Sequence, residues 1–260
     1  MTGERKELHR TKILLTGCNG RMGRVITDLC KEDPDIEIAA GIDVAGQPDG
    51  TYPVYGSFPE VAEAADVIVD FSSPKVFDPM MDYALEHGIP VVVCTTGLSQ
   101  EQIQRLGEAS NKIAVLRSAN MSLGVNLLLK LVREAARKLA PEGFDIEIVE
   151  RHHNQKKDAP SGTALALADS INEGLDGAYD YTFDRSQRLE KRREKEIGIS
   201  AVRGGNIPGT HEVIFAGMDE LVELRHVAYS RSIFGKGAIA AAKFLAGKDA
   251  KMYSMSDVIG

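Results

Sequence analysis

The chain has 260 residues, of which 43% are hydrophobic and 27% are charged, and its formal net charge at pH 7 is −7. This size and composition suit two modest folded domains and exclude a wholly disordered chain. The acidic balance argues against non-specific nucleic-acid binding, which depends on Lys and Arg neutralising phosphates, so an anionic ligand has to meet a local cluster of donors.

The first 120 residues alternate short apolar runs with helix-like stretches. Each run is rich in Ile, Val and Leu and precedes a loop of small residues, which is typical of buried parallel strands joined by helical crossovers. A capping box, Ser99-Gln-Glu-Gln102, predicts the start of one helix. Such a sheet binds ligands at the carboxyl ends of its strands. The predicted strands are Lys12–Thr16, Ile36–Asp43, Asp66–Phe71, Pro90–Cys94 and Ile113–Leu116.

Near Leu123 the pattern changes to a mixture of helices and strands. We expect a polar loop over Arg151–Pro160 and a solvated, charge-dense face over Arg185–Glu196. Three late apolar runs separated by turn residues predict an antiparallel meander. The predicted helices are Val125–Ala140, Ser161–Asn172 and Ser232–Leu245, and the predicted strands are Phe144–Ile148, Gly198–Arg203, Thr210–Ala216 and Glu220–Ala228.

A glycine-rich turn, Gly17-Cys-Asn-Gly20-Arg-Met-Gly23, lies between the first predicted strand and a helix over Arg24–Cys30. Glycines there let backbone amides approach a pyrophosphate at a helix N-terminus. Asp43 ends the next strand, where a carboxylate accepts from ribose hydroxyls. A tight turn without a ligand is the alternative. Because Asp43 repels a 2′-phosphate and Val44 follows it, NADH is expected to bind at least as well as NADPH. Arg21 is the nearby candidate to accept a 2′-phosphate, so the choice of cofactor stays open.

The most informative stretch is Glu150-Arg-His-His-Asn-Gln-Lys-Lys-Asp-Ala-Pro-Ser-Gly-Thr163. It places two histidines and two lysines directly before Pro160–Thr163, which opens a helix. The free amides, hydroxyls and dipole of that helix form a receptor for a carboxylate. The pattern indicates a site for a small anionic substrate with a proton donor beside it; a solvated surface loop is the alternative. We expect no metal, since no Cys or carboxylate stands at ligand spacing beside the histidines.

These motifs occur in an order that closely resembles the 4-hydroxy-tetrahydrodipicolinate reductase family, also called dihydrodipicolinate reductases, from about Lys12 to the C-terminus. The His-His-x-x-Lys and Pro-Ser-Gly-Thr pair is the most specific part of the likeness. The remaining motifs that carry it are Asp70-Phe-Ser-Ser-Pro74, Thr95-Thr-Gly97, Ser118-Ala-Asn-Met-Ser-Leu-Gly124 and Arg203-Gly-Gly-Asn-Ile-Pro-Gly-Thr-His211.

The resemblance implies NAD(P)H-dependent reduction of 4-hydroxy-tetrahydrodipicolinate to tetrahydrodipicolinate, in lysine and diaminopimelate biosynthesis. His152 would be the catalytic histidine, and Lys156 rather than Lys157 would donate the proton. Val44 departs from the arginine that NADPH-using members tend to carry, and Asn206 replaces a common Asp. The substrate would be held by His153, Ser161, Gly162 and Thr163. The cofactor would be lined by Gly17, Cys18, Asn19, Gly20, Arg21, Met22, Asp43, Cys94, Thr95, Thr96, Ser118, Ala119, Asn120 and Met121.

The sequence therefore predicts an α/β chain of two domains. Residues 1–123, completed by a C-terminal helix within 232–260, would form a Rossmann-type, doubly wound parallel sheet that binds the dinucleotide. Residues 124–231 would form a smaller α+β domain for substrate binding and oligomerisation. The expected partner is a small cyclic dicarboxylate, with no nucleic acid and no membrane, and the resemblance implies a homotetramer.

Three widely spaced cysteines predict reduced thiols and a cytoplasmic location. No apolar run approaches the roughly 18 residues of a membrane span. Two other functions stay open. Another two-domain NAD(P)-dependent dehydrogenase would share the first half but would not be expected to carry the His-His-x-x-Lys motif. A non-catalytic dinucleotide-binding protein would bind NADH without turnover.

Overall fold

The structure is a computed structural model that describes residues 10–44, 50–183, 185–186 and 188–260. The chain divides into two compact units. Unit 1 comprises Met1–Leu123 and Arg231–Gly260, and unit 2 comprises Gly124–Ser230. None of the helices in the described ranges has the length and hydropathy needed to cross a membrane.

Unit 1 contains a seven-stranded sheet in the order β12-β6-β5-β4-β1-β2-β3, in which every pairing is parallel. Its strands are β1 (Thr11–Thr16), β2 (Ile36–Ile42), β3 (Val54–Tyr55), β4 (Val67–Asp70), β5 (Val91–Val93), β6 (Ala114–Arg117) and β12 (Lys251–Tyr253). Its helices are α1 (Arg21–Glu32), η1 (Phe58–Glu60), α2 (Pro74–His87), α3 (Gln100–Ala109), α6 (Ser232–Leu245) and α7 (Met255–Ile259).

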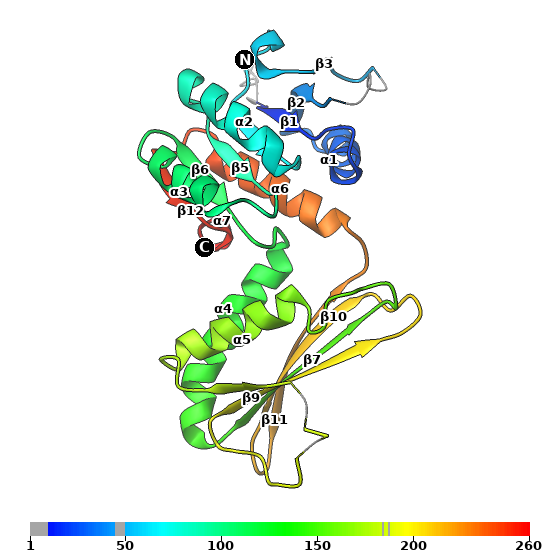
Figure 1. Cartoon of the computed structure of the whole chain (residues 1–260), viewed down its shortest axis with the longest axis vertical. Helices are drawn as coiled ribbons and strands as arrows, with labels where there is room; N and C mark the ends of the chain where they lie inside the picture. The colour runs from blue at the N-terminus through cyan, green and yellow to red at the C-terminus, as the bar shows by residue number, and fades with distance from the viewer. Residues whose placement is uncertain (1–9, 45–49, 184, 187) are drawn as a thin grey trace, which may run out of the picture. The chain divides into compact units, whose positions relative to one another are not determined.

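Alternate residues of β1 face two separate hydrophobic clusters, one on each side of the sheet. Ile13 and Leu15 pack with residues of α1, α6 and α7, whereas Leu14 packs with residues of α2 and α3. Helices therefore cover both faces (Figure 1). Because strands buried on both sides need apolar residues at every position, the near-continuous Ile, Val and Leu runs follow from this layering. The predicted Rossmann-type doubly wound fold is confirmed, and the predicted capping box at Ser99 and Gln102 begins α3.

Unit 2 contains a five-stranded mixed sheet in the order β11-β10-β7-β9-β8. Its strands are β7 (Asp145–His152), β8 (Asp180–Thr182), β9 (Glu196–Arg203), β10 (Gly209–Ala216) and β11 (Leu221–Ala228). Its helices are α4 (Leu123–Leu139), η2 (Ala140–Glu142) and α5 (Gly162–Gly174). In Figure 1, α4 and α5 lie side by side against this sheet, and the core between them includes Val132, Ile148, Leu167 and Val213.

The predicted antiparallel meander is wrong in one pairing. β10 and β11 form an antiparallel hairpin, but β9 pairs with β7 in parallel, and β7 separates β9 from β10. The connection from Arg203 to Gly209 therefore crosses the end of β7, where the amide of Gly204 donates to His152 O and the amide of Asn154 donates to Gly205 O. This crossing brings the glycine-rich connection onto the segment that carries the histidines.

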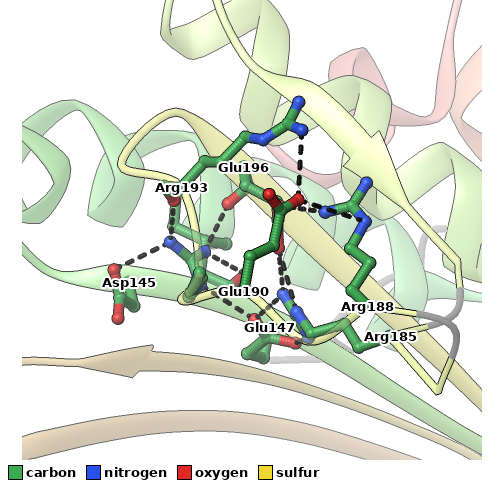
Figure 2. A network of polar contacts seen from close by, with 9 residues as sticks. Asp145, Glu147, Arg185, Arg188, Glu190, Arg193 and Glu196 are labelled. Carbon is green, nitrogen blue, oxygen red and sulfur yellow. Dashed lines mark hydrogen bonds and ion pairs between the residues drawn. The ribbon is translucent and has the colours of Figure 1, made fainter.

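The stretch Arg185–Glu196 is not simply a solvated face, as predicted. The Glu196 carboxylate is buried and accepts from Arg185 (Nε to Oε1, 3.0 Å) and Arg188 (Nη1 to Oε2, 3.0 Å). Arg185 also holds Glu147 of β7 with two bonds of 2.9 and 2.6 Å (Figure 2). Arg192 bonds Glu147 at 3.1 Å. These arginines tie the connection before β9 to the outer face of the sheet.

We expect Glu196→Gln to lower the free energy of unfolding at neutral pH by about 3 kcal/mol, because it leaves buried donors facing an amide. Burial alone would raise the pKa of Glu196, but Arg185, Thr182 and Arg188 outweigh it and lower the pKa. The ionised form therefore contributes stability above the unfolded pKa, which is lost as pH falls through the lower folded pKa. Thermal unfolding of both proteins from neutral to acidic pH checks this: the midpoints should converge in acid, and equal midpoints at neutral pH would contradict it.

Candidate active site

The register of the unit 2 sheet gathers polar side chains at one end of its helix-covered face. Glu150 lies opposite His211 of β10, which lies opposite His226 of β11. In the next row, Arg203 of β9 lies opposite His152, the last residue of β7. Because side chains alternate along a strand, these residues continue the face that buries Ile146 and Ile148. His152 thus lies on a strand and not in the polar loop that was predicted to start at residue 151.

Glu150 is the centre of this cluster and is fully buried. Its Oε2 accepts from Nδ1 of His152 at 2.6 Å and from Arg203 at 2.7 Å. Its Oε1 accepts from Arg203 at 2.6 Å and from the amide of Ser161 at 2.9 Å. Burial alone would raise the pKa of Glu150, but the Arg203 guanidinium, His152 and the Ser161 amide outweigh it and lower the pKa.

Ser161 is the N-cap of α5 and connects that helix to the cluster. Its hydroxyl accepts from the amide of Ala164 at 3.2 Å and bonds Nε2 of His211 at 2.7 Å. Burial and the neighbouring His152 lower the pKa of His211 to about 4, so His211 is neutral at neutral pH. The Ser161 side chain is buried by these contacts, whereas Gly162 is exposed and Thr163 is partly exposed. The predicted carboxylate receptor lies at this first turn, where the Gly162 backbone already bonds the Asp158 carboxylate and helps to lower its pKa.

The two lysines of the loop between β7 and α5 differ in burial. Lys156 is partly buried, with its ammonium 2.9 Å from a carboxylate oxygen of Asp158, and its amide bonds the carbonyl of the partly exposed His153. Hydrogen bonding to Lys156 lowers the pKa of Asp158. Lys157 is exposed. Lys156 thus has an ion-pair partner within its own loop, and its selection over Lys157 as proton donor stays a prediction.

In unit 1, the glycine-rich turn follows the carboxyl end of β1 and joins that strand to α1. Gly17 has a φ of +74°, and its carbonyl accepts from the amide of Gly20. A Cβ on Gly23 would lie 2.3 Å from Cys18 O and 2.4 Å from Gly17 O, so the turn packs directly on α1. The N-cap residue Gly20 has no side chain, so no side-chain hydrogen bond caps the N-terminus of α1, a kind of position at which proteins bind anions.

Asp43 directly follows β2, and one of its carboxylate oxygens accepts from the amide of Asn19 at 3.0 Å. Gly17, Gly20 and Asp43 line a cavity of about 930 Å³, a volume in the range of small-molecule and cofactor sites. The cavity continues along η1 and α2, where its lining includes Phe58, Val61, Lys75, Pro79, Asp82, Tyr83 and Glu86.

The other predicted cofactor residues follow neighbouring strands of the same sheet. Cys94, Thr95 and Thr96 come after β5, and Ser118–Met121 come after β6, so both segments lie at the carboxyl edge with the glycine-rich turn. Asp70, which ends β4, is fully buried and accepts from the Thr16 hydroxyl at 2.6 Å. Among the described side chains, Asp70 Oδ2 and Thr95 Oγ1 are buried without a hydrogen-bond partner. Such orphaned groups at the strand ends fit a bound polar ligand.

The structure therefore gathers the predicted site residues into two groups. The cofactor group, from Gly17 to Met121, lies at the carboxyl ends of the parallel strands of unit 1. His152 and the loop up to Thr163 lie at the carboxyl end of β7 in unit 2. Sequence reasoning assigned no role to Glu150, Arg203 or His211, although all three lie inside the quoted motifs. Within the described ranges, no three His, Cys, Asp or Glu side chains are grouped to hold a metal ion.

Comparison with known proteins places both halves in one family. Residues 11–121 match the family model "Dihydrodipicolinate reductase, N-terminus", and residues 124–259 match "Dihydrodipicolinate reductase, C-terminus". The chain is 50% identical over 248 residues to a 4-hydroxy-tetrahydrodipicolinate reductase of Caldanaerobacter subterraneus subsp. tengcongensis, covering 95% of this chain and 98% of the relative.

Solved structures give the same fold. A dipicolinate-bound dihydrodipicolinate reductase from Paenisporosarcina sp. TG-14 matches with a TM-score of 0.80 at 24% identity, covering 94% of this chain and 97% of that chain. A myo-inositol dehydrogenase from Corynebacterium glutamicum matches less well, with a TM-score of 0.57 at 15% identity, covering 96% and 92%. With both family models matched and half of the residues shared with a relative along nearly its whole length, the chain belongs to the dihydrodipicolinate reductase family.

Proposed function

We propose that the chain reduces 4-hydroxy-tetrahydrodipicolinate to tetrahydrodipicolinate with NADH or NADPH. The observation that carries the proposal is the Glu150–Thr163 segment, which folds into a set of donors with His152, Lys156 and the N-terminus of α5 at one sheet end. A dicarboxylate substrate explains why an acidic protein concentrates its donors there. The related protein from Caldanaerobacter carries this activity in its name.

The residues of unit 1 fit a dinucleotide. The uncapped N-terminus of α1 would receive the pyrophosphate, and Asp43 would receive the ribose hydroxyls. The orphaned polar atoms of Asp70 and Thr95 leave hydrogen-bonding capacity at the same edge. When bound, the nicotinamide supplies the hydride. The 4-hydroxyl of the substrate leaves as water, and the hydride reduces the conjugated imine ring that results.

The residues of unit 2 would bind the substrate and manage the proton. His153 and the amides of Gly162 and Thr163 would hold the carboxylates, each contact contributing about 1.5–3 kcal/mol. The buried Ser161 would act by capping α5. As negative charge builds on the reduced ring, the Lys156 ammonium would donate a proton to it. His152 would stabilise the charge that develops beside Lys156.

The test is consumption of NADH by the purified chain when 4-hydroxy-tetrahydrodipicolinate is generated in the cuvette. The proposal predicts loss of NADH absorbance that depends on both the protein and the substrate. Turnover of a polyol or amino acid instead would favour another two-domain dehydrogenase. NADH binding without turnover would favour a non-catalytic dinucleotide-binding protein.

We propose that NADH is used at least as well as NADPH. Asp43 would repel a 2′-phosphate, and Val44 is largely exposed beside it and offers no cation. The same cavity is lined by two further carboxylates, of Asp82 and Glu86, and by one ammonium group, of Lys75.

Val44→Arg should therefore raise the preference for NADPH, because the guanidinium gives the 2′-phosphate a charged partner worth about 1.5–3 kcal/mol. The measurement is kcat/KM for both cofactors, and Val44→Leu controls for the loss of valine. A wild-type enzyme strongly selective for NADPH would contradict the assignment of Asp43 and Val44.

We propose that the chain assembles as a homotetramer through the outer face of the unit 2 sheet. Helices α4 and α5 cover the other face, whereas Val202 and Leu221 are exposed on the outer one. Light scattering should give four times the 28.2 kDa chain mass. A single-chain mass across micromolar concentrations would contradict the tetramer.

We also propose a cytoplasmic location. Cys18, Cys30 and Cys94 are free thiols, and burial raises the pKa of Cys18 to about 11 and that of Cys30 to about 12. Buried, protonated thiols resist oxidation, and free thiols are typical of reducing compartments.

A further inference from the structure

We infer that Glu150 is a positioning residue for the reaction: it fixes which nitrogen of His152 carries hydrogen and ties His152 to the N-terminus of α5, while Arg203 holds the carboxylate in place. The inference rests on the function proposed for His152 and α5, and it goes beyond that function by assigning tasks to two residues that need not touch substrate.

Four hydrogen-bond donors converge on the two oxygens of Glu150. Nδ1 of His152 and one guanidinium nitrogen of Arg203 meet Oε2, at 2.6 and 2.7 Å. The other terminal nitrogen of Arg203 and the amide of Ser161 meet Oε1, at 2.6 and 2.9 Å. Each oxygen thus faces two donors, so only a side chain with acceptors on both sides satisfies all four. Glutamine cannot, since its NH₂ group would face two of them.

Arg203 allows the buried carboxylate of Glu150 to stay ionised. A buried charge without a partner is strongly unfavourable, and Arg203 supplies a bidentate counter-charge. Arg203 is fixed in turn by the carbonyls of Asp158, at 2.5 Å, and Val202, at 2.8 Å. Its reach to Asp158 also connects it to the loop that carries Lys156.

An ionised carboxylate only accepts hydrogen bonds, so the hydrogen between Glu150 and His152 belongs to Nδ1. The opposite nitrogen, Nε2, lies beside Gly209 of β10, where a Cβ would approach it to 3.1 Å. The ring of His211 meets the His152 ring edge-on at 5.1 Å. The imidazole is thereby fixed at Nδ1 by an acceptor, while Nε2 lies next to a glycine, where a side chain would crowd it.

The same carboxylate sets the position of α5. Its bond to the Ser161 amide holds the N-cap residue, and the Ser161 hydroxyl then bonds the amide of Ala164 and the ring of His211. A change at Glu150 therefore disturbs both the histidine and the helix N-terminus proposed to bind substrate carboxylates. Both kcat and the substrate KM should respond.

A purely stabilising ion pair is the competing explanation, and strand β7 offers a matched control. Glu147 is three residues earlier on β7, points to the opposite face and is also held bidentately by an arginine, Arg185. Glu147→Gln removes an ion-paired carboxylate from the same strand without touching the histidines. We compare it with Glu150→Gln in the full-length protein.

We expect Glu150→Gln to lower kcat at least about 10- to 100-fold, the loss that is typical when the carboxylate that orients a metal-ligating histidine is replaced. Its substrate KM should rise and its NADH Kd should stay near wild type. Glu147→Gln should keep kcat and KM near wild type. Nitrogen-15 NMR of His152, assigned with His152→Gln, should show hydrogen on Nδ1 in the wild type and a changed ring signal in Glu150→Gln only.

The inference is wrong if the wild-type ring carries hydrogen on Nε2 alone, or if a folded Glu150→Gln keeps wild-type kcat and KM. An equal loss of kcat in both glutamine variants also overturns it. Should Glu150→Gln not fold, the wild-type NMR signal still decides. If the wild-type protein lacks reductase activity but carries hydrogen on Nδ1 of His152, the proposed function is wrong. The inference that Glu150 positions His152 would still hold.

Discussion

Replacing Lys156 with alanine is expected to lower kcat by about 10²–10⁴-fold, the usual contribution of a general acid. The substitution removes the ammonium that lies 2.9 Å from Asp158 in the partly buried part of the loop. Substrate binding should weaken too, because the same charge faces a dianion. Steady-state kinetics measure both, and NADH binding should stay close to wild type, since the proposed cofactor residues lie in unit 1.

Lys157→Ala is the matched control for Lys156→Ala. It removes the same charge one position along the chain, from a side chain that is exposed. Its kcat should fall far less. Equal losses in the two variants, or a Lys156→Ala enzyme with only a raised KM, would mean that Lys156 binds an anion and does not donate the proton.

Gly23→Ala is expected to weaken NADH binding about 10- to 100-fold. The new Cβ would lie 2.3 Å from Cys18 O and 2.4 Å from Gly17 O, and backbone atoms cannot yield as a flexible side chain does. The turn has to move away from α1, which withdraws amides from the pyrophosphate. Losing one charge-assisted hydrogen bond costs about 1.5–3 kcal/mol, which corresponds to that change in Kd.

Gly107→Ala provides the comparison for the Gly23 variant. Gly107 lies in α3, where a Cβ would meet nothing within 4 Å, so the alanine should leave NADH binding unchanged and stabilise the helix slightly. Kd is measured by NADH fluorescence titration of folded protein. A folded Gly23→Ala protein with wild-type Kd would contradict the tight packing of the turn.

Most of unit 1 could be predicted because its signals are local. A buried parallel strand needs an unbroken apolar run, and the runs that begin near Lys12, Ile36, Asp66, Pro90 and Ile113 all form strands. The short strands β3 and β12 escaped prediction, since two or three residues at a sheet edge carry no periodicity. Their pairing depends on neighbours that the local sequence does not contain.

The fold of unit 2 was harder to predict because its strands and ion pairs join residues that lie far apart in the sequence. The run Glu196–Arg203 alternates like any hairpin strand, and only packing against β7 decides that it pairs there in parallel. The same limit applies to charge: Arg185 and Glu147 are 38 residues apart, and nothing local distinguishes their ion pair from a solvated face.

In the candidate site, too, local patterns could be predicted from the sequence and long-range contacts could not. Lys156 and the turn at Ser161 could be proposed because each sits in a local pattern of donors before a helix. The contacts of Glu150 with Arg203, and of Ser161 with His211, join residues about 50 positions apart. Only the sheet register, which places β9 and β10 on either side of β7, reveals them.

The most direct measurement of the central claim follows the hydride itself. NADH carrying deuterium at the transferable position of its nicotinamide is incubated with the purified chain and freshly generated 4-hydroxy-tetrahydrodipicolinate, and the product is analysed by mass spectrometry. The account predicts tetrahydrodipicolinate that carries the deuterium, formed in step with loss of NADH. NADH that persists in the presence of substrate, or a product without deuterium, would contradict it.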